Sequence, residues 1–177
     1  MIVHAFVIKN FIPLSHKVQI LHEQYGKIVC MYSQDHQARQ LTTGSIILCH
    51  AEPMHRLYRL EYLEIIRSVV STDLQQLQFV HEIMKICLKL VPDNVVVSDI
   101  FEFLLYVYQN VDTLSVVGRK IVLLRLFLLC EVLPSSSELY QAAMQDPFAM
   151  VPRDLLLLDR FVQIGWHEIA QQKDNRS

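Results

Sequence analysis

The stretch from Lys17 to Tyr32, KVQILHEQYGKIVCMY, constrains the fold of this chain more than any other, because it has the pattern of a β-hairpin. Apolar side chains alternate with other residues at a period of two on both sides of a short segment that contains Gly26. Glycine adopts a positive φ without steric cost, so we expect Gly26 in the turn. A single hairpin is not stable in water. The rest of the chain must therefore supply strands or a helix to cover it.

Three further strands are predicted around this hairpin. The run from Ile2 to Ile8 precedes it, and runs from Gly44 to His50 and from Met54 to Ile66 follow a polar loop over 33–43. We expect Glu52 and Pro53 to interrupt the last two runs. Five short strands with no helical pattern among them predict a small β-barrel or sandwich over residues 1–70.

The hydrophobic period changes from two to that of a helix near residue 72. Thr72-Asp73 has the pattern of a helix cap, and apolar residues then recur at helical spacing until Pro92. Four more helices are predicted, beginning at Ser98, over Leu114–Leu133, over Ser137–Gln145, and from Pro152 through Gln171. The third of the five helices is apolar nearly all round, so we expect it to be central. The fold class is therefore predicted to be α+β, with a helical domain over residues 71–177.

Composition limits the possible functions of the chain. Of its 177 residues 52% are hydrophobic and 19% are charged, and the formal net charge is −2, so long disorder and a strongly basic nucleic-acid binder are both disfavoured. The longest apolar run contains Arg125 and Glu131 and is too short to span a membrane. The first ten residues do not resemble a secretory signal, so we expect a cytoplasmic protein. Residues 1–70 carry seven Lys or Arg against five Asp or Glu, so positive charge gathers in the predicted barrel.

Motifs for catalysis or metal binding are missing from the sequence. It has no phosphate-binding glycine loop, no G-x-S-x-G and no H-E-x-x-H. His50 and His55 flank a proline without ligand partners at metal spacing, and the four cysteines form no C-x-x-C pair. Cys30 occupies an alternating strand position, and the serines at 135–137 follow a helix-ending proline. We therefore expect buried free thiols, no enzymatic activity and no cofactor.

Several short motifs of the chain resemble, in their sequence and in their order, motifs of the bacterial DNA repair protein family RecO. Ala5-Phe6-Val7-Ile8 is similar to the first strand of that family, and Glu23-Gln24-Tyr25-Gly26-Lys27-Ile28 is similar to its hairpin. Downstream, residues 99–105, DIFEFLL, and 126–133, LFLLCEVL, resemble two of its helices. The resemblance covers most of residues 2–135.

The resemblance implies a five-stranded OB-fold barrel followed by an α-helical domain. It further implies a mediator of DNA repair and recombination in the bacterial nucleoid. Such a protein binds single- and double-stranded DNA, anneals strands, and works with RecR and single-strand-binding protein to load RecA. In an OB barrel, cations follow the phosphates and aromatic rings stack on bases. The candidate DNA-binding residues, each of which could instead be a solvated charge or a packed ring, are Lys9, Lys17, Lys27, Arg39, Arg56, Arg59, Phe11, Tyr25, Tyr32 and Tyr58.

A partner site is implied in the helical domain. The acidic, apolar tail of single-strand-binding protein would need cations beside apolar residues. The candidates for that site are Arg119, Lys120, Arg125, Leu124 and Leu128.

The chain also departs from the family in three places. The basic segment after the hairpin is replaced by 33–40, SQDHQARQ, the zinc-binding cysteines are missing, and Leu133-Pro134 stands where a glycine is usual. The first departure predicts weak, salt-sensitive DNA binding. A non-enzymatic protein-interaction module that has lost DNA binding is the alternative.

Overall fold

The computed structural model describes the chain except for residues 12–14, 33–39, 69–72, 134–136, 150–154 and 175–177. It consists of two compact units, residues 1–101 and 102–177, and the division falls within α2. The change from strands to helices falls between β5 and α1, around the predicted domain boundary at residue 70, and α1 lies in the same compact unit as the strands. The elements of the first unit are β1 (Val3–Asn10), β2 (Lys17–His22), β3 (Gly26–Tyr32), β4 (Ile46–Met54), β5 (Leu57–Arg67), α1 (Leu74–Leu90) and the start of α2 (Ser98–Gln109).

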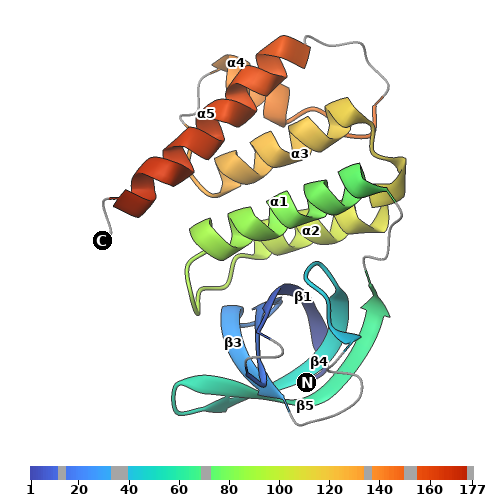
Figure 1. Cartoon of the computed structure of the whole chain (residues 1–177), viewed down its shortest axis with the longest axis vertical. Coiled ribbons are helices and arrows are strands. Elements are labelled where there is room, and N and C mark those ends of the chain that lie inside the picture. The colour runs from blue at the N-terminus through green and yellow to red at the C-terminus, as the bar shows by residue number, and fades with distance from the viewer. Residues whose placement is uncertain (12–14, 33–39, 69–72, 134–136, 150–154, 175–177) are drawn as a thin grey trace. The chain divides into compact units, whose positions relative to one another are not determined.

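The five strands close into a barrel in the order β1-β2-β3-β5-β4 (Figure 1). All neighbours are antiparallel except β3 and β5, which run parallel over Cys30–Tyr32 and Tyr58–Leu60. A closed five-stranded barrel with this order is an OB-fold, and helices follow it. The α+β fold class expected from the sequence is therefore confirmed.

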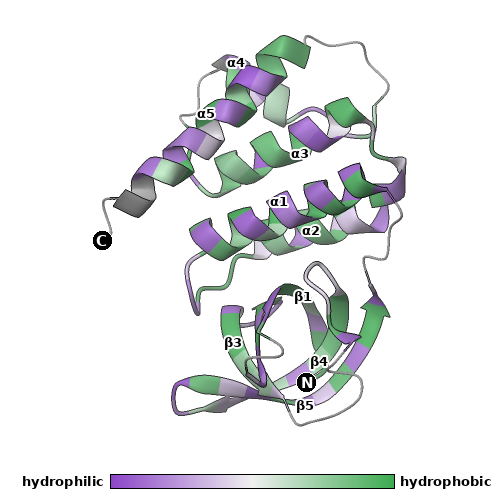
Figure 2. Ribbon diagram, in the orientation of Figure 1, coloured by the Kyte–Doolittle hydropathy of each residue, from purple (hydrophilic) through white to green (hydrophobic). Residues whose placement is uncertain are grey.

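The barrel interior is filled by alternate residues of every strand. Ala5 and Val7 of β1 and Val18 and Ile20 of β2 are fully buried in one cluster that also contains Cys30. The outer face of β1 is buried too, because α1 packs against this strand and the ring of Phe6 meets Phe101 edge-on, with 5.2 Å between centroids. In Figure 2, α1 shows alternating hydrophilic and hydrophobic bands, as expected for a helix with one covered face.

One prediction about the strands is wrong. Pro53 was expected to end a strand, but β4 continues through it to Met54, and Pro53 lies opposite Tyr58. Beyond residue 51 this part of β4 has β5 as its one described neighbour, and proline is tolerated where a strand has a free edge. The β4–β5 hairpin consequently extends away from the barrel, as the cyan-green arm in Figure 1 shows.

All regular secondary structure in the described part of the second unit is helical. Its elements after α2 are a short 3₁₀ helix, η2 (Val111–Thr113), and α3 (Val116–Leu129), α4 (Ser137–Ala143) and α5 (Leu155–Asp174). As expected from its sequence, α3 is the most buried of them, and it packs against both α4 and α5. Gly165 of α5 lies against the ring of Phe127, where an added Cβ would stand 2.4 Å from a ring carbon. None of the described helices is long and apolar enough to cross a membrane.

Candidate functional site

One outer row of side chains crosses four strands of the barrel. Lys17 of β2 pairs with Met31 of β3, Met31 pairs with Arg59 of β5, and Arg59 pairs with Glu52 of β4. Cross-strand partners project on the same face of a sheet, and the flanking residues Val18, Cys30 and Leu60 point inward. These four residues, hereafter the outer row, are therefore neighbours on the solvent side.

Two chain connections flank the outer row. The β1–β2 connection ends where Lys17 begins β2, and the β4–β5 turn at His55 and Arg56 ends just before Arg59. Because β2 runs antiparallel to β3 and β5 runs parallel to it, the chain before Lys17 and the chain before Arg59 lie on opposite sides of the row. Arg56 is exposed in that turn. The row, the β4–β5 turn and the described residues Phe11 and His16 of the β1–β2 connection together make up the candidate surface.

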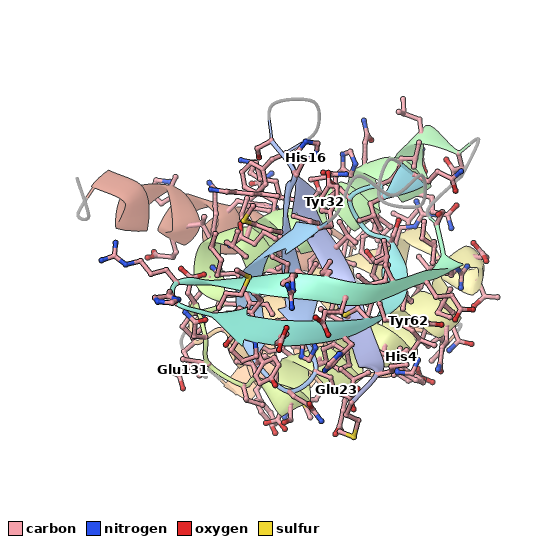
Figure 3. All side chains as sticks on the ribbon, turned by 90° about the horizontal axis from the view of Figure 1, so that it is seen from below. His4, His16, Glu23, Tyr32, Tyr62 and Glu131 are labelled. Atoms are coloured by element: carbon pink, nitrogen blue, oxygen red, sulfur yellow. The ribbon has the colours of Figure 1, made fainter. Side chains whose placement is uncertain are left out.

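The β1 side of this surface carries a second cation and two rings. Lys9 is exposed and pairs with Gln19, and its ammonium lies 4.8 Å from the centre of the Phe11 ring. The backbone N–H of Phe11 donates to the carbonyl of Lys17, so the two segments are held side by side. His16 is exposed and meets Tyr32 edge-on at 6.1 Å, and Figure 3 shows the two side chains together.

Acidic side chains hold the guanidinium of Arg59. It donates to Glu52 Oε2 and to Glu61 Oε1, each at 2.6 Å, and Glu61 also lies 3.5 Å from His50 Nδ1. The hydrogen bond from Arg59 lowers the pKa of Glu52, and the hydrogen bond to Glu52 raises the pKa of Arg59. The carboxylate of Glu52 is therefore ionised at neutral pH. The formal charges of Glu52 and Glu61 balance the two positive charges of the outer row.

Lys27 is used inside the first unit rather than on this surface. Its side chain is buried, and Nζ donates to the carbonyl of Leu88 at 2.9 Å and lies 3.3 Å from Asp93. Leu88 is in the last turn of α1, where unpaired carbonyls favour a cation. Lys27 thus links the β2–β3 hairpin to the C-terminal end of α1.

Three of the four candidate aromatic residues lie in the barrel core or pack against it. Tyr25 stacks on His22 with centroids 4.7 Å apart, and Tyr58 lies 5.1 Å from Tyr25. Both tyrosines pack against the barrel core, and Tyr32 is buried. The structure therefore favours the alternative of packed rings for these three. Phe11 is half-buried on the outside, and Arg39 lies outside the described residues.

Most of the candidate tail-binding residues are buried or make contacts inside the second unit. Leu124 is fully buried. Arg125 donates to the carbonyls of Ala143 and Gln145 and lies over the ring of Phe103 at 5.0 Å, while Lys120 is paired with Asp159. Arg119 and Leu128 are half-buried. A pocket for an acidic tail at these residues stays a prediction.

Sequence reasoning missed four members of the surface, namely His16, Met31, Glu52 and Glu61. Met31 could have been found, because a hairpin that turns at Gly26 sets Lys17 opposite it. Glu52 and Glu61 could not, since their approach to Arg59 depends on the pairing of β4 with β5. That pairing skips Glu61, so this residue occupies a bulge between the partners of Ala51 and His50. In the described part of the chain, no three His, Cys, Asp or Glu side chains gather as metal ligands would.

Comparison with known proteins adds no relative. The chain matches no protein-family model, and a search among curated proteins finds no match. Arguments about function therefore rest on the barrel and its outer surface.

Proposed function

We propose that this protein is a RecO-like mediator of DNA repair and recombination, which binds DNA on the outer row of its OB barrel. One observation carries the proposal: Lys9, Lys17, Arg56 and Arg59 gather on the face that includes β2 and β3, between the β1–β2 and β4–β5 connections. OB-folds bind oligonucleotides at this face and at these two connections.

The chemistry of the surface suits a single nucleic-acid backbone. Its cations can contact phosphates, and the exposed side chains of Met31 and His16 and the half-buried ring of Phe11 offer apolar or aromatic contact to bases. Stacking on an aromatic side chain contributes about 1–3 kcal/mol per base. The four cations can make at most four phosphate contacts. A plot of the logarithm of the DNA-binding constant against the logarithm of the salt concentration should therefore have a slope of roughly −3 at its steepest. Affinity should therefore be modest and salt-sensitive.

Replacing Lys17 with glutamate is expected to weaken DNA binding about tenfold at low salt, because it removes one phosphate contact and adds a repelling charge. Fluorescence anisotropy with a labelled 20-nucleotide oligo-dT at 50 mM and 200 mM salt measures the effect. Lys85→Glu makes the same change in charge on an exposed position of α1 and serves as the control. If the two variants bind oligo-dT with equal affinity, the DNA does not lie on the outer row.

A protein-interaction module without DNA binding is the second candidate. It is favoured by the charge balance of the outer row and by the exposed apolar residues Leu155, Leu156, Leu157 and Ile164 of α5. Partners of RecO such as RecR and single-strand-binding protein would then be retained without DNA. No binding of oligo-dT by the folded wild-type protein at 50 mM salt would favour this candidate.

A further inference from the structure

We propose that the tip of the β4–β5 ribbon, residues 54–57, enters the major groove of duplex DNA. This inference rests on the proposed function and names the part of the same surface that takes the double-stranded substrate. It is carried by the shape of the ribbon, the side chains at its tip and the contacts at its base (Figure 1).

The ribbon tip projects beyond the neighbouring strands. β3 pairs with β5 from Tyr58 onward and β1 pairs with β4 only up to Cys49, so in the described part of the chain residues 54–57 pair only with each other. At about 3.4 Å per residue, the two residues beyond the pair of Pro53 and Tyr58 reach about 7 Å. This length covers most of the depth of the major groove, about 8.5 Å, and the side chains of the tip extend it.

The thickness of the ribbon decides which groove it can enter. Paired strands lie about 4.8 Å apart, and a sheet with its side chains forms a layer about 10 Å thick. The major groove of B-DNA is about 12 Å wide and admits a two-stranded ribbon, whereas the minor groove is about 6 Å wide. The ribbon tip therefore fits the major groove without deformation of the DNA.

The side chains of the ribbon tip suit the edges of base pairs. Met54, His55 and Arg56 are exposed, and residues 53–60 contain no Asp or Glu. In the major groove, an arginine can donate to O6 and N7 of guanine, and an apolar side chain can contact the methyl group of thymine. The tip thus offers a donor and an apolar group to the bases and no negative charge to the phosphates.

The base of the ribbon is held by contacts on both strands. Tyr58 packs against the barrel core with its ring 5.1 Å from that of Tyr25, and Arg59 donates to Glu52 across the two strands at 2.6 Å. Pro53 restricts the backbone of β4 opposite Tyr58. A tip presented in this way loses little conformational freedom on binding.

A filled major groove tests this placement on the wild-type, full-length protein. Anisotropy at 50 mM salt compares a labelled 20-base-pair duplex with the same duplex in which every cytosine carries a glucosylated 5-hydroxymethyl group. The sugar occupies the major groove and leaves the charge of the DNA unchanged. We expect the glucosylated duplex to bind about tenfold more weakly, and equal affinities for the two duplexes would overturn the inference.

The matching change in the protein removes the side chains of the tip. Met54→Ser with Arg56→Ser should bind the plain duplex about tenfold more weakly and labelled 20-nucleotide oligo-dT at most about threefold more weakly. This variant should no longer distinguish the two duplexes. The control, Lys85→Ser with Met144→Ser, removes an exposed cation and an exposed methionine elsewhere and should retain the wild-type affinities.

The outcomes separate this inference from the proposed function. Equal losses for both probes in the tip variant, unchanged duplex binding in that variant, or the same loss in the control would overturn the inference. Binding of oligo-dT without binding of the plain duplex by the wild type would also overturn it. Failure of the folded wild-type protein to bind either probe would instead refute the proposed function.

Discussion

Replacing Gly26 with alanine is expected to destabilise the protein by about 4 kcal/mol, because it combines an unfavourable backbone conformation with an overlap that no side chain can relieve. Gly26 has φ +69°, a region that alanine rarely adopts. A Cβ at this position would stand 1.8 Å from the carbonyl oxygen of Val95. Since the opposing atom belongs to the backbone, the hairpin or the segment after α1 would have to move.

The segment after α1 is held in place next to this glycine. The N–H of Asn94 donates to the carbonyl of Lys27, and the ammonium of Lys27 is fixed between Leu88 and Asp93. Chemical denaturation of the variants Gly26→Ala and Gly44→Ala separates the cost of the backbone conformation from the cost of the steric overlap. Gly44 also has a positive φ, 89°, so its variant reports the cost of the backbone conformation, about 1 kcal/mol. If Gly26→Ala loses no more unfolding free energy than Gly44→Ala, the close packing of Gly26 against Val95 would be contradicted.

Acidification is expected to remove about 3 kcal/mol of stability through His22. This side chain lies inside the barrel with 2% of its surface exposed, and Nε2 has no hydrogen-bond partner among the described residues. Burial lowers the pKa of His22 from 6.5 to about 4, and the positive N-terminus contributes in the same direction. The unfolded chain therefore binds the proton first. The contribution of neutral His22 is complete above pH 6.5 and is lost as the pH falls towards 4.

The free energy of unfolding between pH 7.5 and 4.5 measures this effect. Asparagine at position 22 can keep an acceptor for the N–H of Gln24, which now donates to His22 Nδ1, but it takes up no proton. We expect His22→Asn to be less stable at neutral pH and to lose the steep dependence between pH 6.5 and 4.5. His50→Asn, at a half-exposed site, should retain it. Parallel pH profiles for wild type and His22→Asn would assign the acid sensitivity to other groups.

Local patterns sufficed to predict most elements of this fold. The hairpin runs over Lys17–Tyr32 as expected, and its turn has the positive φ at Gly26. Asp73, in the expected cap, accepts a hydrogen bond from the N–H of Gln75. Alternation and caps depend on residues close in the chain, so sequence shows them directly. The continuation of β4 through Pro53 was missed because the cost of a proline depends on whether its strand edge is free.

The candidate site was less predictable because its residues act through distant partners. Lys27 has the sequence context of an exposed hairpin cation. Its ammonium instead donates a hydrogen bond to the carbonyl of Leu88 in the last turn of α1, 61 residues later. Tyr25 and Tyr58 have the residue type that stacks on bases, but they pack against the barrel core and contact each other. Arg59 was among the predicted DNA contacts, whereas the carboxylates that accept hydrogen bonds from it became visible only with the pairing of β4 and β5.

Photo-crosslinking tests most directly the claim that DNA lies on the outer row. Single-stranded DNA containing 5-iodouracil is bound to the full-length wild-type protein at 50 mM salt, irradiated, and the crosslinked peptides are identified by mass spectrometry. Met31 belongs to the outer row, and the rings of Phe11 and His16 lie on the same candidate surface. We expect crosslinks in the peptides that contain these residues and in the β4–β5 turn. Crosslinks confined to residues 102–149 would contradict the assignment of the barrel surface as the nucleic-acid site.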